Sequence, residues 1–360
     1  MAGGGMVGGG APVRVPSARG GLSRDGVRAL GREAMAEASR IGAAAAGGGG
    51  GGGYSGLAIN GSSAAACLGG GGGAAAASVA GGPLAYGFAA DQNARFRKYM
   101  EDEHTAVVDF AQRRGALYCG LYDGHGGRTA VEFVQSHLHA SVERELLAAS
   151  PTDAPLDALK RAFVKLDRML LQVGALHCGT TAAVCLCLPS AAVGGGVELH
   201  VANVGDSRVV LAADGGRPAR RLSVDHVGTD ASEVRRVQEE GGTVVNGRVG
   251  GSLAVTRALG DHCLKTEHSP GVSPEPHVTR HAVAHGDRFV ILASDGVWDV
   301  HSDEDAADLV LSYADAAGGG GGGGGGRAEA LDDVANKLVA SAIARGSRDN
   351  ISALVIRLPR

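Results

Sequence analysis

Regular patterns of apolar and polar residues begin near residue 84 and continue to the C-terminus. Short apolar runs bounded by turn residues predict strands, and apolar residues spaced three or four apart predict helices. The predicted strands are residues 105–110, 117–122, 181–188, 197–204, 208–212, 289–293 and 352–358, with further extended chain at 243–255. The predicted helices are residues 131–146, 155–170, 232–240, a helix that begins at Ser302, and residues 328–344.

Local signals at the helix ends support these assignments. Pro155 stands at the start of a helix, where its missing N–H costs nothing. Ser302 offers a capping hydroxyl, followed by a run of three acids in the first turn. The elements run as strands, two helices, many strands, two helices and a strand. Because strands and helices do not alternate, this order favours an α+β fold in which antiparallel sheets are covered by helices.

Glycine changes this picture for two segments. The chain has 360 residues, of which 61 are Gly and 44% are hydrophobic, and the glycine lies in blocks. Residues 1–83 are a Gly/Ala-rich, low-complexity tail with few large apolar side chains to offset the entropy of ordering, so we expect the tail to be disordered. Residues 84–360 are expected to fold as one domain, interrupted by a polyglycine insertion at residues 318–326.

Charge and cysteine usage narrow the function classes. With Lys+Arg 34, Asp+Glu 38 and a sequence pI near 6.3, the chain offers no electrostatic case for binding nucleic acid or an anionic membrane. No apolar run is long enough to cross a bilayer. The 6 cysteines form no CxxC motif and are expected to be buried free thiols in a reducing compartment. We expect the cytoplasm or the nucleus, and arginines between residues 14 and 40 leave organelle targeting by the tail open.

Acidic residues stand at the ends of several predicted strands. Glu101 and Asp102 precede the first strand, and Asp123 ends the second. The other acids in such places are Asp206, Asp295, Asp299 and Asp349. If the strand ends meet at one rim, these carboxylates repel one another and need cations. Oxygen ligands alone suit Mg²⁺ or Mn²⁺ rather than zinc, although each acid taken singly is also ordinary turn chemistry.

One of these places joins an acid to a base. Asp123, Gly124 and His125 end a strand, and two more glycines follow before a helical pattern begins. Glycine allows the main chain to turn sharply and lets its carbonyls approach a ligand. Asp-Gly is also a common turn pair, so the functional interpretation depends on the other acids at strand ends.

In this order, these residues resemble the metal-dependent Ser/Thr protein phosphatases of type 2C. The matching motifs are RKYMED at 97–102, YDGHGG at 122–127, GTTA at 179–182, NVGDSR at 203–208, DH at 225–226, LAVTRALGD at 253–261, SDGVWD at 294–299 and RDN at 348–350. They span essentially residues 84–360, and the chain is most similar to the compact single-domain eukaryotic members. The resemblance implies a four-layer α-β-β-α sandwich, with two central antiparallel sheets flanked by helices and a metal site at one end.

The resemblance also implies metal ligands. Asp123 would bridge two Mg²⁺ or Mn²⁺ ions, Asp295 and Asp349 would complete one site, and Glu101 with the carbonyl of Gly124 would serve the other. Two ions roughly 4 Å apart can bind one water and lower its pKa towards neutrality. The resulting hydroxide would attack the phosphoryl group of a phosphoserine or phosphothreonine directly, without a phosphoenzyme intermediate.

Further roles follow from the same resemblance. Asp206 and Asp299 match a weaker third metal site, and Asp102 would support the ligands from behind. Arg97 would bind the phosphate, for which a planar guanidinium is well suited. His125 would be the general acid that protonates the leaving alkoxide, because the unperturbed pKa of histidine lies near neutrality.

Departures from the family pattern leave parts of the function open. Val227 and Gly228 follow the DH motif where the family commonly has Lys-Pro, so substrate preference in the flap beside the active site is undetermined. Trp298 is the single Trp, which argues against the plant subgroup whose flap carries a tryptophan. His226, beside the flap, is expected to be structural.

Other function classes fit this sequence less well than a phosphatase does. A two-metal nuclease is disfavoured by the absence of a basic patch, and a non-catalytic binding module would be expected to have lost a ligand or the acid. The Gly-rich blocks alone would suit a structural protein, which the dense motif set makes a poor fit. We therefore expect a monomer that dephosphorylates phosphoserine and phosphothreonine proteins, with a tail that can bind regulators.

Overall fold

The computed structural model describes residues 76–79, 82–149, 154–190, 195–215, 217–318 and 331–359. All of them belong to one compact unit, Leu57–Arg360. The predictions for residues 1–75 of the tail and for residues 319–326 of the insertion lie outside the described residues. In the part of the chain that is described, no helix combines the length and the apolar character needed to span a membrane.

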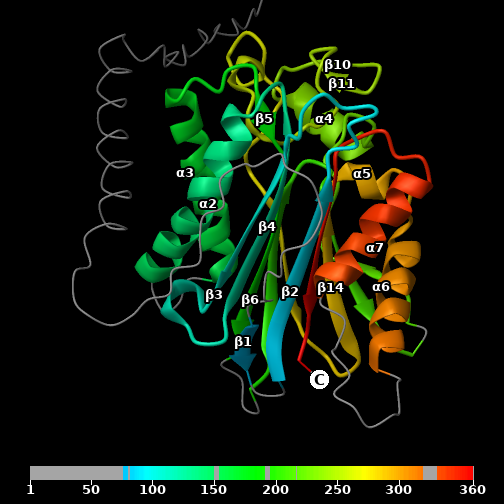
Figure 1. The fold of residues 1–360 in the computed structure, drawn as a ribbon. Helices are drawn as coiled ribbons and strands as arrows, with labels where there is room; N and C mark the ends of the chain where they lie inside the picture. Colours follow the sequence, from blue (N-terminus) through cyan, green and yellow to red (C-terminus); the bar gives the residue numbers. More distant parts are fainter. Residues whose placement is uncertain are drawn as a thin grey trace, which may run out of the picture. The chain divides into compact units, whose positions relative to one another are not determined.

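Two antiparallel sheets form the centre of the unit (Figure 1). The first sheet, in spatial order, contains β1 (Ala76–Val79), β2 (Gly82–Asp91), β15 (Ile351–Arg357), β14 (Asp287–Ala293), β8 (Arg208–Ala213) and β9 (Arg220–Arg221). The second contains β12 (Leu259–Gly260), β5 (Gly179–Thr180), β4 (Leu117–His125), β6 (Ala182–Pro189), β7 (Val197–Val204) and β13 (His277–Ala282), with β3 (Asp102–Val108) paired to β4. A short separate ribbon pairs β10 (Val244–Val245) with β11 (Arg248–Val249).

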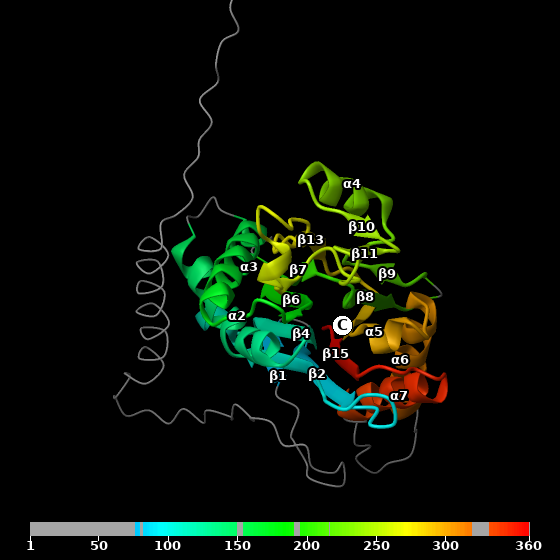
Figure 2. The same cartoon turned by 90° about the horizontal axis from the view of Figure 1, so that it is seen from above.

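Helices cover the outer faces of both sheets (Figure 2). The helices are α2 (Thr129–Ala148), α3 (Pro155–Gln172), α4 (Ala231–Glu239), α5 (Asp295–Trp298), α6 (Asp303–Gly318) and α7 (Leu331–Ala344), with short 3₁₀ segments η1 (Phe110–Gln112) and η2 (His262–Leu264). The pair α2 and α3 packs on the second sheet, and the pair α6 and α7 packs on the first. The predicted α+β fold, a four-layer α-β-β-α sandwich, is confirmed.

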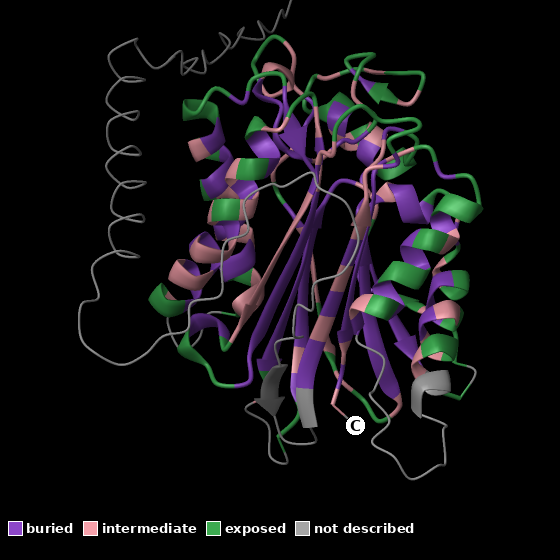
Figure 3. Cartoon of the chain, viewed as in Figure 1, coloured by how far each residue is buried: buried purple, intermediate pink, exposed green. Residues whose placement is uncertain are grey.

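Strand β4 shows why the strands are apolar on both faces. Leu117, Cys119 and Leu121 point into the core between the two sheets. The alternate residues Tyr118 and Tyr122 point to the other face and pack beneath α2 and α3. Because successive side chains of a strand alternate between faces, a strand in a middle layer must be apolar at every position (Figure 3). Nearly all of β4 up to Tyr122 is therefore buried, and polar residues enter only at its end.

Most predicted elements are found within a few residues of their predicted bounds. Helix α3 begins at Pro155 and β7 spans the predicted residues. The hydroxyl of Ser302 accepts a hydrogen bond from the N–H of Asp305 at 3.0 Å, so Ser302 caps α6 as expected. The predicted start of the last helix at residue 328 lies outside the described residues, which begin again at Leu331.

Several expectations differ from the structure. The sheet begins at Ala76, eight residues before the predicted domain start at residue 84, because β1 and β2 form a hairpin on its edge. Strand β13 was not predicted, since its sequence is polar and partly exposed at the edge of the second sheet. Residues 243–255 contain only the two-residue strands β10 and β11. Of the cysteines in the described ranges, Cys119, Cys178, Cys185 and Cys187 are buried free thiols as expected, and Cys263 is partly exposed.

Candidate metal centre

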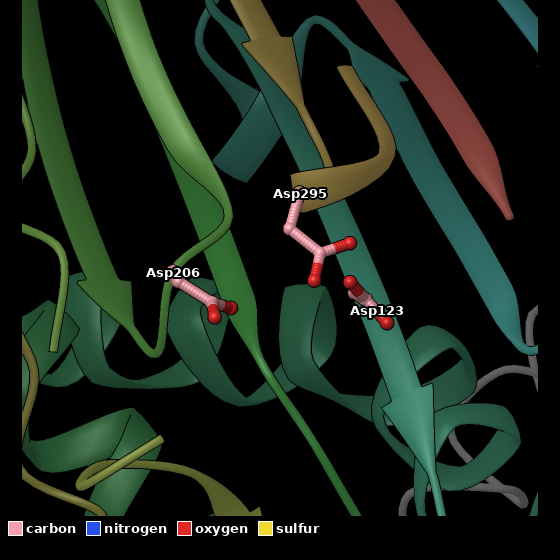
Figure 4. Close-up of side chains that lie close together, drawn as sticks. All are labelled: Asp123, Asp206 and Asp295. Atoms are coloured by element: carbon pink, nitrogen blue, oxygen red, sulfur yellow. The ribbon is translucent and has the colours of Figure 1, made fainter. Parts of the chain in front are cut away.

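Three aspartates from different elements meet at one end of the two sheets. Asp123 lies near the end of β4, Asp206 lies in the turn between β7 and β8, and Asp295 is the first residue of α5, directly after β14. One carboxylate oxygen from each lies within 4.8 Å of those of the other two. Figure 4 shows the three carboxyl groups turned toward the same space. The two sheets thus bring together side chains that are far apart in the sequence.

The close approach of these carboxylates raises their pKa values. Burial raises the pKa of Asp123 well above its usual value, and Asp102, Asp295 and Asp206 raise it further through repulsion. Burial, with the charges of Asp206 and Asp349, raises the pKa of Asp295 to about 8. Burial is also the main reason that the pKa values of Asp102 and Asp206 rise to about 6. The cluster therefore holds more negative charge than the protein around it can stabilise.

The donor set fits a hard divalent cation. One oxygen of Asp295 and one of Asp102 are buried and have no hydrogen-bond partner in the described chain. A buried carboxylate oxygen without a partner is costly, and a cation removes that cost. The gathered donors are all carboxylate oxygens, which suit Mg²⁺ or Mn²⁺.

Neighbouring hydroxyl groups fix the backbone beneath the cluster. The N–H of Asp123 donates to the hydroxyl of Thr181 at 3.1 Å, and the hydroxyl of Thr180 donates to the carbonyl of Asp123 at 3.0 Å. Asp102 lies opposite Asp123 on β3 and accepts a hydrogen bond from the hydroxyl of Ser294 at 2.9 Å. Since Ser294 directly precedes Asp295, this bond ties the two sheets together beneath the carboxylates.

The remaining predicted residues lie around this cluster. The carbonyl of Glu101 accepts a hydrogen bond from the N–H of Gly124 at 3.0 Å, and its carboxylate accepts one from the N–H of Gly127 at 2.9 Å. The Glu101 carboxylate is thus directed at a main-chain N–H. Asp299 lies one turn after Asp295 and is exposed as a residue, but partial desolvation of its carboxylate, together with the charge of Asp349, raises its pKa.

Arg97 lies at the rim of the cluster. Its guanidinium forms an ion pair with Asp349, and its Nε donates to the carbonyl of Arg348 at 3.4 Å. The Arg97 side chain is 48% exposed, so the guanidinium borders both solvent and the acidic residues. A phosphate that approaches the cluster from solvent would therefore meet Arg97.

His125 has a partner that the sequence analysis did not identify. Its Nε2 lies 2.7 Å from an oxygen of Asp261, which is buried. Strand β5 joins the two residues, because it pairs with β4 on one side and with β12, which ends just before Asp261, on the other. A Cβ atom on Gly179 would lie 2.0 Å from the Asp261 carboxylate and 2.7 Å from His125 Nε2, so only glycine leaves room for this contact. Asp261 does end one of the motifs quoted above, and that position was the only signal in the sequence.

The flap beside the site, residues 227–274, is held together by its own capping and ionic contacts. The N–H groups of Ser232 and Glu233 donate to the Asp230 carboxylate at 2.9 Å and 3.0 Å, so Asp230 is the N-cap of α4. The buried Glu233 carboxylate accepts hydrogen bonds from Arg257 and Arg236 and from the hydroxyl of Thr256. Despite burial, these partners lower the pKa of Glu233 to about 2.

The departure from the family pattern in the flap has a local explanation. Gly228 donates its N–H to the carbonyl of Ala254 at 2.9 Å, and a Cβ atom there would lie 2.2 Å from the carbonyl oxygen of Gly247. A larger residue at position 228 would thus force the flap open. His226 is buried, and its main-chain N–H donates to the carbonyl of Gly205 at 3.0 Å. Burial lowers the pKa of its side chain to about 3, in keeping with a structural residue.

Comparisons with known proteins agree with this geometry. The family described as Protein phosphatase 2C matches residues 86–351. Protein phosphatase 2C homolog 1 of Saccharomyces cerevisiae is 34% identical over 76% of this chain and 92% of its own length. Its namesake in Schizosaccharomyces pombe is 38% identical over 76% of this chain and 73% of its own length. The crystal structure of a serine-threonine phosphatase 2C from Toxoplasma gondii shares the fold, with a TM-score of 0.60 and 22% identity over 76% of this chain and 95% of that one.

Proposed function

Because this chain belongs to the protein phosphatase 2C family and is a metal-dependent Ser/Thr protein phosphatase, we propose that the acidic cluster is its catalytic centre and that His125 and Arg97 act on the phosphoryl group. The observation that carries this proposal is the meeting of Asp123, Asp206 and Asp295, with one oxygen of Asp295 buried and unpaired. Its substrates are serine and threonine phosphates in proteins.

The ligand roles come from the family resemblance. Asp123 would contact both of two Mg²⁺ or Mn²⁺ ions, with Asp295 and Asp349 on one side and Glu101 with the Gly124 carbonyl on the other. Asp206 is one of the three converging acids and, with the exposed Asp299, would hold a weaker third ion. When bound, the ions would lower the pKa of water so that hydroxide forms near neutral pH, and they would neutralise phosphoryl oxygens.

Arg97 would orient the substrate. Its guanidinium is half-exposed and contacts Asp349 at the rim, so an incoming phosphate can replace Asp349 as its partner. A phosphate dianion matches the guanidinium fork better than a single carboxylate does, because two parallel N–H···O bonds form. Arg97 would thus hold the phosphoryl group and offset the charge that develops on its oxygens.

His125 would protonate the leaving group. Asp261 holds Nε2, so this nitrogen donates to the carboxylate and Nδ1 is the atom that can deliver a proton. An alkoxide of serine or threonine leaves poorly unless it is protonated, and a positioned acid typically contributes about 10²–10⁴-fold. Asp261 fixes the tautomer and the orientation of the ring.

Direct attack on phosphorus, without a phosphoenzyme, agrees with the placement of the thiols. Cys119 and Cys187 lie in the core between the sheets, and burial contributes to pKa values well above their usual range. Such thiols are poor nucleophiles. We also propose that the protein acts as a monomer in the cytoplasm or nucleus.

The test is hydrolysis of a phosphothreonine peptide by the purified full chain, with Mn²⁺ or with a chelator, alongside Asp295→Ala. We expect turnover that needs both the metal and Asp295, and no change in the far-ultraviolet circular dichroism of the variant. A folded wild-type protein that binds the peptide but never hydrolyses it would instead identify a phosphatase-like binding module.

A further inference from the structure

A buried ion pair behind the active site holds the segment that carries Asp261. Asp167, on α3, is 5% exposed, and one of its carboxylate oxygens accepts hydrogen bonds from the N–H of Gly260 at 2.8 Å and from Nζ of Lys265 at 2.7 Å. Lys265 also donates to the carbonyl of Ala258 at 2.8 Å. Lys265 therefore closes residues 258–265 into a loop, and Asp167 binds this loop at Gly260 and at Lys265.

The backbone of that loop needs such an anchor. Asp261 has a φ of 50° and Gly260 has a φ of 89°, both in the left-handed region. A non-glycine residue in this region is strained and persists only where its surroundings hold it. Around Asp261, the fixed points include the Asp167 contacts, the β5 pairing and a hydrogen bond from its N–H to the carbonyl of Cys178 at 2.9 Å. The N–H of Cys263 also donates to the carbonyl of Leu176 at 2.9 Å.

We propose that Asp167 and Lys265 are positioning residues for the general acid: through their contacts with the segment that carries Asp261, they hold Asp261 in reach of His125. This inference rests on the general-acid role proposed above for His125. Asp167 has no part in metal binding, since it lies on α3 rather than among the converging aspartates. Its loss would misplace Asp261 and, through it, His125 Nδ1.

The experiment compares two substrates with different leaving groups. p-Nitrophenyl phosphate releases a stable anion and needs little help from an acid, whereas a phosphothreonine peptide releases an alkoxide. We expect His125→Ala to lower turnover of the peptide about 100-fold more than turnover of p-nitrophenyl phosphate. Asp167→Ala should lower turnover of the peptide about tenfold more than turnover of p-nitrophenyl phosphate. Asp167→Asn keeps an oxygen for the Gly260 N–H and should recover part of that loss.

Glu145→Ala is the matched control. Glu145 is a buried carboxylate of α2 that pairs with Arg161 and Lys165 of α3, in the same helical layer, and it does not contact residues 258–265. It should reduce both rates equally, in step with the folded fraction. Asp167→Ala that behaves like Glu145→Ala would overturn the inference, and Lys265→Met decides the question if Asp167→Ala does not fold. Equal losses in His125→Ala would instead count against the proposed general acid itself.

A second feature is the exposed basic and aromatic loop that contains Arg97, residues 94–99. Phe96 is 45% exposed and Tyr99 is 59% exposed. Arg95 lies 5.2 Å from the centroid of the Phe96 ring, and Arg348 lies 5.7 Å from the centroid of the same ring. Lys98 lies 5.1 Å from the centroid of the Tyr99 ring. None of these three cations has a carboxylate partner in the part of the chain that is described.

The loop is held in place at its base. The amide of Asn350 donates to the carbonyls of Gln92 at 2.8 Å and of Tyr99 at 3.0 Å. The amide of Gln92 donates to the carbonyls of Arg97 at 3.1 Å and of Lys98 at 3.0 Å. These bonds fix an exposed loop around Arg97, so the unpaired cations are presented beside the phosphate-binding position rather than folded against the protein.

We infer that this loop selects phosphoprotein segments with acidic residues beside the phosphorylated Ser or Thr. The chain as a whole carries a net charge of -4, so the local positive charge is a feature of this surface and not of the composition. Acidic residues next to the phosphate would meet Arg95 and Lys98, and the aromatic rings would cover the peptide backbone. This inference also depends on the proposed catalytic centre.

The test compares phosphothreonine peptides whose flanking residues are all Glu or all Gln. We expect kcat/KM to be about tenfold higher for the Glu peptide at low ionic strength, and the difference to shrink in about 0.5 M salt. The double variant Arg95→Ala/Lys98→Ala should abolish the preference while turnover of p-nitrophenyl phosphate is retained. Arg113→Ala/Arg114→Ala, an exposed pair just before β4 and at the opposite end of that strand from Asp123, is the control and should keep the preference.

Equal kcat/KM for the two peptides in the wild type, or a preference that survives in Arg95→Ala/Lys98→Ala, would overturn this inference. Preferential binding of the loop to anionic vesicles, with no peptide preference, would mean that it contacts membranes. Loss of turnover of every substrate in the wild type would count against the catalytic centre and not against the loop.

Discussion

Two sets of buried carboxylates in this protein show opposite responses to burial. In the acidic cluster, burial and mutual repulsion raise the pKa of Asp295 to about 8. In the flap, Glu233 is also buried, but hydrogen bonds from Arg257, Thr256 and Arg236 lower its pKa to about 2. Burial opposes ionisation in both, so the partners decide the sign. Glu233 is paired within the chain, whereas the carboxylates of the cluster converge on one another and are suited to cations from outside.

This difference separates structural from catalytic carboxylates. The charges of a structural ion pair are satisfied within the chain, and removing one partner leaves a buried charge unpaired. In a metal site the carboxylates lack cationic partners within the chain, so the stability of the fold depends on metal binding. The two regions can therefore be told apart by what happens when a carboxylate is removed and when the metal is removed.

The largest expected effect is on activity. Asp123→Asn should lower turnover of a phosphothreonine peptide with Mn²⁺ about 10³-fold or more, because Asp123 would serve both ions. In the presence of chelator the same variant should unfold at a higher temperature than the wild type, since one repelling carboxylate is gone. Steady-state kinetics and thermal unfolding measure the two quantities. A variant that loses activity and also loses stability in chelator would mean that Asp123 behaves like Glu233.

The opposite outcome is expected in the flap. Glu233→Ala should lower the free energy of unfolding by about 3–5 kcal/mol, because Arg236 and Arg257 lose their buried partner. Denaturant unfolding with and without Mn²⁺ should give the same loss. Glu240→Ala is the control, since Glu240 also bonds Arg236 but its side chain is 47% exposed, and it should cost about 1 kcal/mol or less. A loss that vanishes in Mn²⁺ would contradict a purely structural role.

Metal binding should stabilise the folded protein through the acidic cluster and not through the ion pairs of Glu233. At a Mn²⁺ concentration about 100-fold above its dissociation constant, the wild type should gain about 2.7 kcal/mol in unfolding free energy. Asp295→Asn should lose most of that gain, whereas Glu233→Ala should keep it despite being less stable. The comparison fails if the two variants respond to Mn²⁺ alike.

The smallest expected effect concerns pH. The pKa of Asp295 is about 8 in the folded protein against 3.8 ordinarily, so the stability associated with it is complete below about pH 4 and is lost as the pH rises through 8. Between about pH 7.5 and pH 8.5, where histidines are neutral whether the protein is folded or not, the loss should reach about 0.7 kcal/mol in chelator. Thermal unfolding as a function of pH measures it, and Mn²⁺ or Asp295→Asn should remove it. A flat profile in chelator would show that the cluster is not under electrostatic strain.

Much of the fold could be predicted from local sequence because local physics decides it. Strand β7 was predicted at its observed bounds, since a run of apolar residues in a doubly covered sheet has few alternatives. Pro155 and Ser302 marked helix starts because capping depends on neighbouring residues alone. Strand β13 was missed because an edge strand is half-exposed and its polar residues carry no clear period.

The candidate site, like the fold, was predictable only in part from the sequence. The sequence showed that acids stand at strand ends, and the resemblance named Asp123, Asp295 and the others as ligands. That resemblance could not show that Asp206 lies within 4.8 Å of both, or that Asp261, 136 residues from His125, holds its imidazole at 2.7 Å. Asp167 and Lys265 carried no signal of their own in the sequence.

The sequence by itself thus determined the type of each element and the chemical kind of each donor, because both depend on residues within a few positions of one another. Only the tertiary structure decided which carboxylate pairs with a guanidinium, which lies in the metal cluster, and which orients the proposed general acid His125. Those partners come from strands and helices that are distant along the chain, and the register of the two sheets alone sets the distances on which Coulomb and hydrogen-bond energies depend.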